Sequence, residues 1–459
     1  MTNRIERLSR DARDYTVCIM GMGFVGVTLA TAMADAGFKV IGVEHREDVC
    51  DRLSSGEPHF FEPGLSDHLS RAVATGRIVI HTRIPEQCKA TVFIVTVGTP
   101  IGEDGRVALT SVENVSEEIA ANLKDGDFII LRSTVMLGTT RRIVRPILEK
   151  TGKEFQIAFC PERTVEGQAM VELRYLPQII GADDQETRHR AAQIFQYLTP
   201  TVVKVSNSET AEMIKLIDNA KRDVIFGYSN EVARLCDAVG ISAAEVIQSG
   251  RFGYSRTDLP MPGPVGGPCL TKDSYILGQS MESYGIKPEI TLAARRTNER
   301  QSEDVATFLG TLIRDIDGFP PDPQISLLGI AFKGRPVTDD VRGTTAKPIL
   351  EGLRRAFPEG EFYGFDPVVD ADTITSLGMI PKATVETAFA GANMVVILNN
   401  HAMFGSIPIE KLAGTMRSGG VIYDFWHNFH GMPLLLPRGM RYVALGSHSS
   451  AIIGGGEES

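Results

Sequence analysis

YTVCIMGMGFVGVTLATAMA, residues 15–34, decides how the first half of the chain folds. An apolar run (16–20) leads into a G-x-G-x-x-G pattern formed by Gly21, Met22, Gly23, Phe24, Val25 and Gly26. The first glycine allows a tight turn, the second lets a pyrophosphate approach the backbone, and the third lets helix and strand pack closely. Twenty residues without a charge resemble a membrane span, but glycines in their middle favour a buried strand, a turn and a helix. We therefore predict a dinucleotide-binding turn and no membrane partner.

The next apolar run indicates which dinucleotide is bound. Residues 39–43 form a second predicted strand, and Glu44 follows it. An acid at this place accepts hydrogen bonds from both ribose hydroxyls and repels a 2′-phosphate, so the pattern favours NAD over NADP. Arg46, two residues on, weakens that preference slightly.

Apolar runs alternate with helical patterns through the rest of the first 205 residues. Further predicted strands are 78–81, 92–97, 128–131, 156–159, 178–181 and 202–205. Such alternation is typical of an α/β fold with a parallel sheet covered by helices on both faces. Thr110 and Glu113 have the spacing of a capping box that opens one of the helices.

The predicted secondary structure changes twice after this domain, first to helices alone and then back to alternating strands and helices. Ser206 and Glu209 signal a helix start, residues 209–239 have helical periodicity, and more helix follows a Gly- and Pro-rich loop (251–269). A Pro-rich linker (319–323) precedes renewed alternation, with strands at 325–330, 361–365, 394–398, 421–424 and 441–444. We predict domains at 1–205, 206–318 and 319–459: a nucleotide-binding domain, a helical middle domain and a second, smaller α/β domain.

Composition excludes several functional classes. With 43% hydrophobic and 23% charged residues the chain has ordinary globular usage, and its net charge of −10 offers no footprint for nucleic acid. The six cysteines form no C-x-x-C pair, so we predict neither a metal site nor a disulfide framework. A reducing cytoplasm is the default compartment.

Three further segments carry candidate chemistry. Thr99 and Thr134 each follow a predicted strand, where ligands of doubly wound sheets bind, although ordinary turn chemistry explains them equally well. Gly266 and Gly267 lead to Cys269 at a predicted helix start, where unpaired N–H groups favour a thiolate. A buried structural cysteine is the alternative for Cys269, and it is the expected fate of the other five.

The chain resembles the nucleotide-sugar 6-dehydrogenase family, which includes UDP-glucose and UDP-N-acetylhexosamine dehydrogenases. The resemblance is carried by ordered motifs at 21–26, 62–65, 99–100, 133–140, 161–167, 212–219, 230–231, 266–273, 329–333, 339–342 and 366–367. It implies two Rossmann-like doubly wound domains joined by a central helical dimerisation domain, NAD as cofactor, a UDP-sugar as substrate, and a homodimer or higher homo-oligomer.

The resemblance also implies a four-electron oxidation of the sugar's C6 alcohol to a carboxylate through a thiohemiacetal and a thioester. Cys269 is then the nucleophile, Lys215 and Asn219 stabilise an oxyanion, and Thr134, Glu166 and Asp273 orient or deprotonate water. The cofactor contacts implied are residues 21–26, Glu44, Arg46, Thr99, Thr134 and Arg342. The substrate contacts implied are Glu162, Arg163, Glu166, Lys215, Asn219, Arg222, Arg251, Arg256, Gly266, Gly267, Lys333 and Arg342. Of Arg251 and Arg256, one is expected to reach a neighbouring subunit's site.

The sugar itself stays open between two branches of that family. The stretches 161–163 and 261–267 resemble the N-acetylhexosamine branch, which we favour, whereas Glu166 and the ending Lys272-Asp273 follow the UDP-glucose branch. A two-electron hydroxyacid dehydrogenase of similar layout is a more distant alternative. It would need neither Cys269 nor a C-terminal nucleotide domain.

Overall fold

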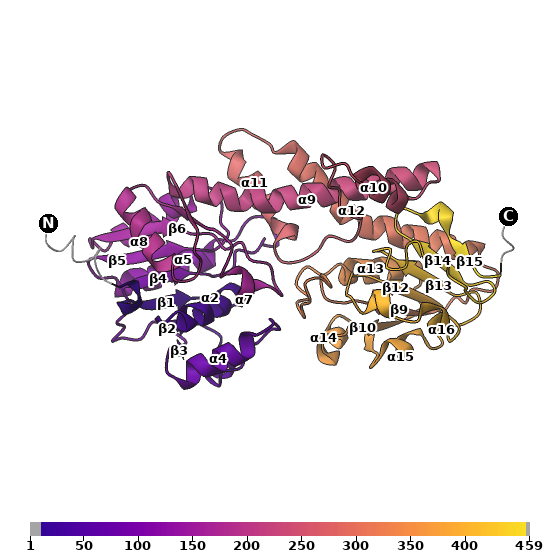
Figure 1. Cartoon of the computed structure of the whole chain (residues 1–459), viewed down its shortest axis with the longest axis horizontal. Helices are drawn as coiled ribbons and strands as arrows, with labels where there is room; N and C mark the ends of the chain where they lie inside the picture. The colour runs from indigo at the N-terminus through magenta and orange to yellow at the C-terminus, as the bar shows by residue number, and fades with distance from the viewer. Residues whose placement is uncertain (1–10, 456–459) are drawn as a thin grey trace. The chain divides into compact units, whose positions relative to one another are not determined.

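The computed structural model describes residues 11–455 and divides into two compact units (Figure 1). The first holds the described residues up to Asp218 together with Tyr275–Pro288, and the second holds Asn219–Ser274 and the described residues from Glu289 onward. Two helices of the predicted middle domain, α9 (Ser208–Val239) and α11 (Leu270–Glu282), contribute residues to both units. No helix within residues 11–455 is both long and apolar enough to cross a membrane.

The first unit is built on an eight-stranded sheet in the order β3-β2-β1-β4-β5-β6-β7-β8, which contains the Rossmann order 3-2-1-4-5-6. Its strands are β1 (Thr16–Met20), β2 (Lys39–Val43), β3 (Ile78–His81), β4 (Val92–Val95), β5 (Asp127–Leu131), β6 (Phe155–Phe159), β7 (Gln178–Gly181) and β8 (Val202–Val205). Its helices are η1 (Ala12–Asp14), α2 (Phe24–Asp35), α3 (Glu47–Ser54), α4 (Leu65–Ala74), α5 (Thr110–Asn122), η2 (Thr140–Val144), α6 (Arg145–Glu149), α7 (Ala169–Glu172) and α8 (Gln185–Phe195).

Side chains alternate between the two buried faces of this sheet. On β1, Val17 and Ile19 pack in a core with α2, α4 and α8, whereas Cys18 and Met20 pack in a core with α5 and α6. Burial on both faces is why these strands read as continuous apolar runs, and it confirms the predicted doubly wound arrangement.

The prediction of a wholly parallel sheet is wrong at one edge. β6 and β7 pair antiparallel, so β7 and β8 run opposite to the first six strands. A parallel return needs a crossover helix that packs on the sheet. The connection between β6 and β7 has only the single turn of α7, so the chain enters β7 from the end where β6 left.

Two predicted helix starts also differ in detail from the structure. α5 does begin at Thr110, but Leu109 with its apolar side chain occupies the cap position, so no capping box forms. α9 begins at Ser208, and Asn207 rather than Ser206 accepts the hydrogen bond from the Thr210 amide, at 2.8 Å. An asparagine side chain caps as well as serine does, and sequence spacing alone cannot separate two adjacent candidates.

The second unit has a seven-stranded sheet in the order β11-β10-β9-β12-β13-β14-β15, parallel except that the edge strand β15 pairs antiparallel with β14. Its strands are β9 (Gln324–Leu328), β10 (Glu361–Phe365), β11 (Ile380–Pro381), β12 (Met394–Ile397), β13 (Val421–Asp424), β14 (Arg441–Ala444) and β15 (Ile452–Ile453). Its helices, besides its parts of α9 and α11, are α10 (Ala243–Arg251), α12 (Glu289–Leu312), η3 (Ile313–Asp315), α13 (Ala346–Ala356), α14 (Ala371–Ser376), α15 (Val385–Phe389), η4 (Phe404–Ser406), α16 (Ile409–Ala413) and η5 (His448–Ser450). The strand order repeats that of the first sheet, so both predicted α/β domains are confirmed as Rossmann-like.

Candidate active site

The glycine-rich turn between β1 and α2 has the geometry that its pattern predicts. Gly21 has a left-handed φ of 95°, and a Cβ on Gly26 would lie 2.0 Å from the Gly21 carbonyl oxygen. A Cβ on Gly23 would meet no atom of the described chain within 4 Å. Gly26 therefore serves the packing of helix on strand, while Gly23 keeps open space at the N-terminus of α2. Such a terminus, with its outward N–H groups, fits a pyrophosphate.

Glu44 lies beside this turn at the end of β2 and is buried. Its carboxylate accepts hydrogen bonds from the amides of Met22 and Arg46, each at 3.2 Å. The Arg46 guanidinium is 3.8 Å away and His45 Nδ1 is 3.1 Å away. The acid is thus fixed against the glycine turn, where its carboxylate would accept hydrogen bonds from the hydroxyls of a dinucleotide's ribose.

The loops that follow β4 and β5 meet, as their positions in a parallel sheet predict. The buried Thr99 hydroxyl donates to the backbone carbonyl of Thr134. Thr96, which sequence reasoning missed, donates its hydroxyl to the Met20 and Gly21 carbonyls and so ties the β4 loop to the glycine turn. The sequence does not show whether the hydroxyl of a threonine after a strand makes such a hydrogen bond or is exposed to solvent.

The loop after β6 is organised by a buried ion pair that sequence reasoning also missed. Arg132 Nη2 lies 2.5 Å from Glu162 Oε2, and Glu162 Oε1 accepts from the amides of Arg163 and Thr164 at 2.7 and 2.8 Å. Burial would raise the pKa of Glu162, but the Arg132 charge, with a smaller contribution from Lys215, holds that pKa below its ordinary value. Glu162 stays ionised and shapes its loop, and its contact with substrate remains a prediction.

The half-buried Glu166 lies further along the same loop. Buried Glu62, from the segment before α4, accepts hydrogen bonds from the amides of Gly167 and Ala169 at 2.6 and 2.7 Å. These two bonds hold the backbone on the C-terminal side of Glu166. Residues 62–65 are one of the motifs that carry the family resemblance, which implies no role for them. In the structure, Glu62 of this motif holds the loop that bears Glu166.

Helix α9 carries both members of the predicted oxyanion pair. Lys215 and Asn219 are one turn apart and both are buried. Asn219 Nδ2 donates to Asp273 Oδ2 at 2.5 Å, and Asp273 Oδ1 accepts from Lys272 Nζ at 2.7 Å. The structure thus brings two predicted site residues, Asn219 and Asp273, into direct contact and adds Lys272 to them.

Cys269 immediately precedes α11, as predicted, and it is the exposed cysteine among the six, all of which lie in the described chain. Its carbonyl accepts from the amides of Lys272 and Asp273 at 3.2 and 2.9 Å, the pattern of a helix's first turn. The other five cysteines are buried. Burial raises the pKa of the Cys160 thiol to about 12, whereas a hydrogen bond from Cys18 lowers the pKa of the Cys88 thiol to about 6.

A buried Arg295–Asp223 pair shapes the loop around Cys269. The two charges are 3.0 Å apart, and the Arg295 guanidinium also donates to the carbonyl oxygens of Leu270 and Val265 at 3.0 and 3.4 Å. These carbonyls flank Cys269 on both sides. Both charged residues lie within helical patterns, where sequence reasoning expects a solvated face, so nothing in the sequence singled them out.

The remaining predicted contacts are cationic or backbone positions in the second unit. Gly266 and Gly267 pack against Gly343, since the Gly267 amide donates to the Gly343 carbonyl at 2.9 Å. Lys333 is half-buried, and the exposed Arg342 pairs with Asp340 at 2.7 Å.

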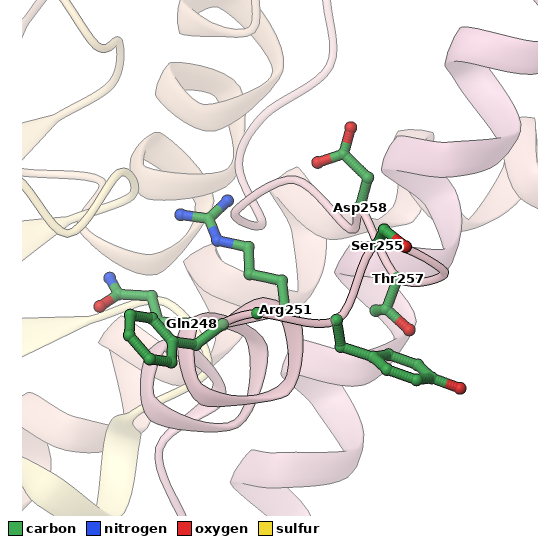
Figure 2. A pocket seen from close by; sticks show the side chains of 8 residues that line it. Gln248, Arg251, Ser255, Thr257 and Asp258 are labelled. Carbon is green, nitrogen blue, oxygen red and sulfur yellow. The ribbon is translucent and has the colours of Figure 1, made fainter.

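Besides Arg342, three predicted arginines of the second unit are exposed: Arg222, Arg251 and Arg256. Arg251 borders an open depression of about 700 Å³ after α10, together with Gln248 and Asp258 (Figure 2). The residues that line this depression include none of the predicted NAD contacts.

The chain matches three domain models of one family over most of its length. These are the NAD binding domain (residues 15–199), the central domain (209–300) and the UDP binding domain (326–430) of the UDP-glucose/GDP-mannose dehydrogenase family. The first match spans strands β1 to β7 of the sheet that carries the glycine turn and Glu44. The third spans most of the second sheet.

Relatives and solved structures agree with these matches. UDP-N-acetyl-D-mannosamine dehydrogenase of Pyrococcus horikoshii is 30% identical over 87% of this chain and 93% of its own length. The enzyme of the same name from Escherichia coli is 30% identical over 85% and 94%. The structure of the P. horikoshii UDP-D-ManNAc dehydrogenase superposes with a TM-score of 0.85 at 28% identity, covering 95% of this chain and 100% of that one. A UDP-N-acetyl-mannosamine dehydrogenase from Staphylococcus aureus gives 0.80 at 26%, covering 94% and 98%.

The position of Glu44 predicts the cofactor preference. A 2′-phosphate beside this buried carboxylate meets like-charge repulsion, so we expect NADPH to bind at least about tenfold more weakly than NADH. Titration of each reduced cofactor by its fluorescence measures the two dissociation constants. Glu44→Gln should narrow the difference. Equal affinities of the wild type for NADH and NADPH would contradict the role of Glu44, and Arg46 would be the next residue to substitute.

Proposed function

Because this chain belongs to the UDP-glucose/GDP-mannose dehydrogenase family, we propose that it oxidises the C6 alcohol of a UDP-N-acetylhexosamine to the uronate, with UDP-N-acetyl-D-mannosamine as the favoured substrate. It is an NAD-dependent oxidoreductase. The observation that carries the four-electron reaction is the exposed Cys269 at the start of α11. The choice of sugar is supported by relatives of that name at 30% identity.

The reaction needs a nucleophile because a hydride leaves only from a tetrahedral carbon. When bound, NAD⁺ would supply the hydride acceptor for each of the two oxidations, and one water would supply the second carboxylate oxygen. The first oxidation converts the alcohol to an aldehyde and releases one proton. The Cys269 thiolate then adds to the aldehyde carbon, and the second hydride leaves from the resulting thiohemiacetal to give a thioester.

Lys215 and Asn219 stabilise the oxygen that becomes an oxyanion at each stage. Asn219 Nδ2 has two hydrogens, of which Asp273 accepts one. The other is thereby aimed in a fixed direction, and Asp273 acts on the amide's orientation. Asp273 has both oxygens engaged, by Asn219 and by Lys272, so it suits orientation better than proton removal.

Water cleaves the thioester, which releases the Cys269 thiol and the carboxylate. Glu166 accepts the water's proton in this proposal, with Thr134 orienting the water. Glu62 supports that role, because its bonds to Gly167 and Ala169 fix the backbone beside Glu166. The nucleotide part of the substrate belongs to the second unit, where Lys333, Arg342 and the glycines before Cys269 are its proposed contacts.

We also propose a homodimer formed through the central helices, in a reducing cytoplasm. Apolar side chains stand exposed on α9, on α10 and just after α10: Tyr228, Leu235, Val239, Val246 and Phe252, with Phe252 89% exposed. Exposed apolar groups concentrated on one set of helices indicate an interaction surface. Arg251 lies directly before Phe252, so a dimer through this surface would carry Arg251 toward the second copy.

The dimer is tested by placing charges on this surface. Leu235→Glu together with Val239→Glu should shift the chain from dimer to monomer, because a buried interface rejects unpaired carboxylates. Light scattering after size exclusion measures the mass. Val79→Glu, at an exposed position on β3, is the matched control and should leave the mass unchanged. A wild type that is monomeric at micromolar concentration would contradict the proposal.

The substrate and stoichiometry are tested together with a panel of UDP-sugars. We expect two NADH per sugar nucleotide consumed, a free carboxylate by product mass, and the highest kcat/KM with UDP-N-acetyl-D-mannosamine. A preference for UDP-glucose would move the chain to the other branch, which Glu166 and the Lys272-Asp273 ending favour. A ratio of one NADH, with aldehyde or ketone as final product, would eliminate the four-electron reaction.

Cys269→Ala tests the covalent step. An unpositioned water lacks the effective molarity of a fixed thiol, so carboxylate formation should fall by at least about a thousandfold. Affinities for NAD⁺ and the UDP-sugar should change by less than roughly tenfold, since the thiol acts only after the first hydride has left. Supplying the aldehyde should not restore activity.

Cys236→Ala is the matched control, because Cys236 is a buried cysteine on α9 that the mechanism does not use. It should keep kcat within about twofold, while any effect appears in thermal stability. Uronate formation by Cys269→Ala at near wild-type rate would make Cys269 structural and the mechanism wrong.

A further inference from the structure

Glu212 is a carboxylate that the proposed mechanism does not use, yet it is almost completely buried, with 1% of its surface exposed. It lies on α9 one helical turn before Lys215. Burial raises its pKa, although three hydrogen bonds from Thr140 and Gly138 oppose that effect. A buried acid is costly unless its oxygens accept strong hydrogen bonds, so its partners indicate what it does.

The three donors belong to Gly138, in the loop after β5, and to Thr140, the first residue of η2. Glu212 Oε2 accepts from the Gly138 amide at 2.5 Å, and Oε1 accepts from the Thr140 amide at 3.0 Å and from the Thr140 hydroxyl at 2.6 Å. Gly138 has a left-handed φ of 86°, which turns the backbone so that both amides face one carboxylate. The acid thus occupies the N-terminus of the helical segment η2–α6, where negative charge is favoured.

This loop is also the one that carries Thr134. Its upstream end is held where Thr99 donates to the Thr134 carbonyl, and its middle where the Leu137 amide donates to Ser280 Oγ at 3.0 Å. Glu212 is the tie between the downstream end of the loop and α9. The helix that bears Lys215 and the loop that bears Thr134 are therefore joined through one side chain.

We propose that Glu212 is a positioning residue, which sets the place of the Thr134 loop relative to the Lys215 turn of α9 during water attack on the thioester. The proposal rests on the function proposed above. It predicts a defect in thioester hydrolysis rather than in ligand binding, because Thr134 is assigned to water and Glu212 is buried away from solvent.

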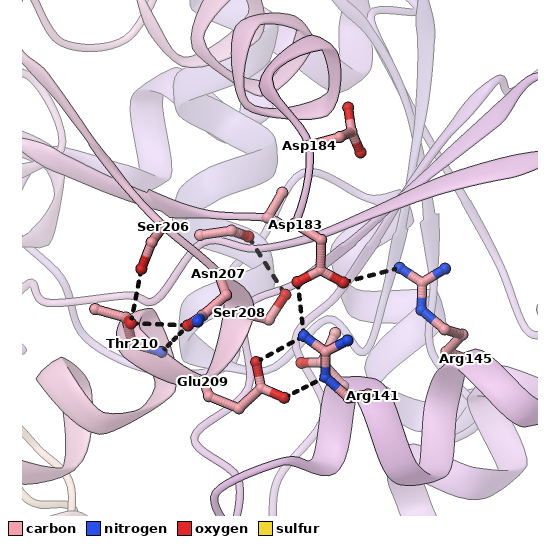
Figure 3. Close-up of polar contacts among 12 residues, drawn as sticks. Arg141, Arg145, Asp183, Asp184, Ser206, Asn207, Ser208, Glu209 and Thr210 are labelled. Atoms are coloured by element: carbon pink, nitrogen blue, oxygen red, sulfur yellow. Dashed lines mark hydrogen bonds and ion pairs between the residues drawn. The ribbon is translucent and has the colours of Figure 1, made fainter.

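A second acid on the same helix provides the comparison. Glu209 lies one turn before Glu212 and pairs with Arg141, which also reaches Asp183 at 2.7 Å (Figure 3). This network is partly exposed and joins side chains to side chains. Exposed ion pairs contribute little, and within residues 11–455 Glu209 accepts no hydrogen bond from the backbone of the Thr134 loop, so its loss should leave that loop in place.

Glu212→Gln is the informative variant, because glutamine keeps the shape but offers one acceptor oxygen and one NH₂ donor. Whichever way it turns, the amide of Gly138 or of Thr140 then faces a donor. We expect kcat to fall on the order of 10- to 100-fold with KM values within about threefold, as for a displacement near 1 Å. Acid-quenched enzyme should carry more covalently bound sugar nucleotide than wild type, by intact-protein mass. Glu209→Gln should behave like wild type in both measurements.

Hydrogen–deuterium exchange gives a readout that does not depend on activity. In Glu212→Gln, exchange should accelerate in a peptide covering residues 136–141 and stay unchanged in other peptides. Thr140→Val, which removes only the hydroxyl donor, should keep that peptide protected. If Glu212→Gln does not fold, hydrogen–deuterium exchange of the wild type tests the proposal instead. The proposal is wrong if the amides of Gly138 and Thr140 exchange as fast as those of an unstructured peptide.

The two proposals fail in different ways. If none of the sugar nucleotides tested supports NAD⁺ reduction by the wild type, the proposed function is wrong. The exchange measurement then still tests the Glu212 contacts. An active wild type with Glu212→Gln equal to Glu209→Gln in kcat overturns the positioning role alone. Accelerated exchange spread over the whole first unit, or a lowered kcat without more covalent adduct, would make Glu212 merely structural and also overturn it.

Discussion

Buried carboxylates that accept backbone N–H groups are the constraint on which the candidate site depends. Within residues 11–455 four glutamates are buried, and each accepts hydrogen bonds from backbone amides of a loop in the first unit. Glu44 accepts from Met22, Glu62 from Gly167, Glu162 from Thr164 and Glu212 from Gly138. Loops after parallel strands leave amides without a ladder partner, and buried amides must be satisfied. A carboxylate satisfies two at once with charge-assisted bonds, which places a loop more rigidly than a neutral side chain would.

In the second unit a buried guanidinium, rather than a carboxylate, bonds the loop backbone. Around Cys269 the groups that need partners are carbonyls, and Arg295 donates to those of Leu270 and Val265 while Asp223 balances its charge. Replacing one member of such a buried pair leaves an unpaired charge, at a cost of about 3–5 kcal/mol. The exposed thiol is therefore held by residues with no proposed contact to substrate. The same division applies in the first unit, where Glu62 and Glu212 act on Glu166 and Thr134 only through the backbone.

The sequence pattern predicted the positions of central strands well, and it predicted strand direction and helix caps poorly. The strands at 16–20, 39–43 and 421–424 begin and end where the apolar runs predict, because burial on both sheet faces requires uninterrupted apolar sequence. The orientation of β7, the cap at Asn207 and the missing capping box at Thr110 were predicted wrongly. Each depends on a choice between near-equal local alternatives. Short edge strands such as β11 and β15 were missed for a related reason: two residues carry no periodicity.

The sequence by itself determined the two Rossmann-like domains, the glycine turn with Glu44, the helix of Lys215 and Asn219, and the start of α11 just after Cys269. These follow from periodicity, glycine at forced backbone positions and residue spacing, all of which are local. Only the tertiary structure decided that Asn219 contacts Asp273, that Arg132 pairs with Glu162, that Arg295 pairs with Asp223, and that Glu62 and Glu212 hold distant loops. A charged residue in a helical or loop pattern looks the same whether it is solvated or buried. Its burial and its partner, often dozens of residues away, are set by how the elements pack.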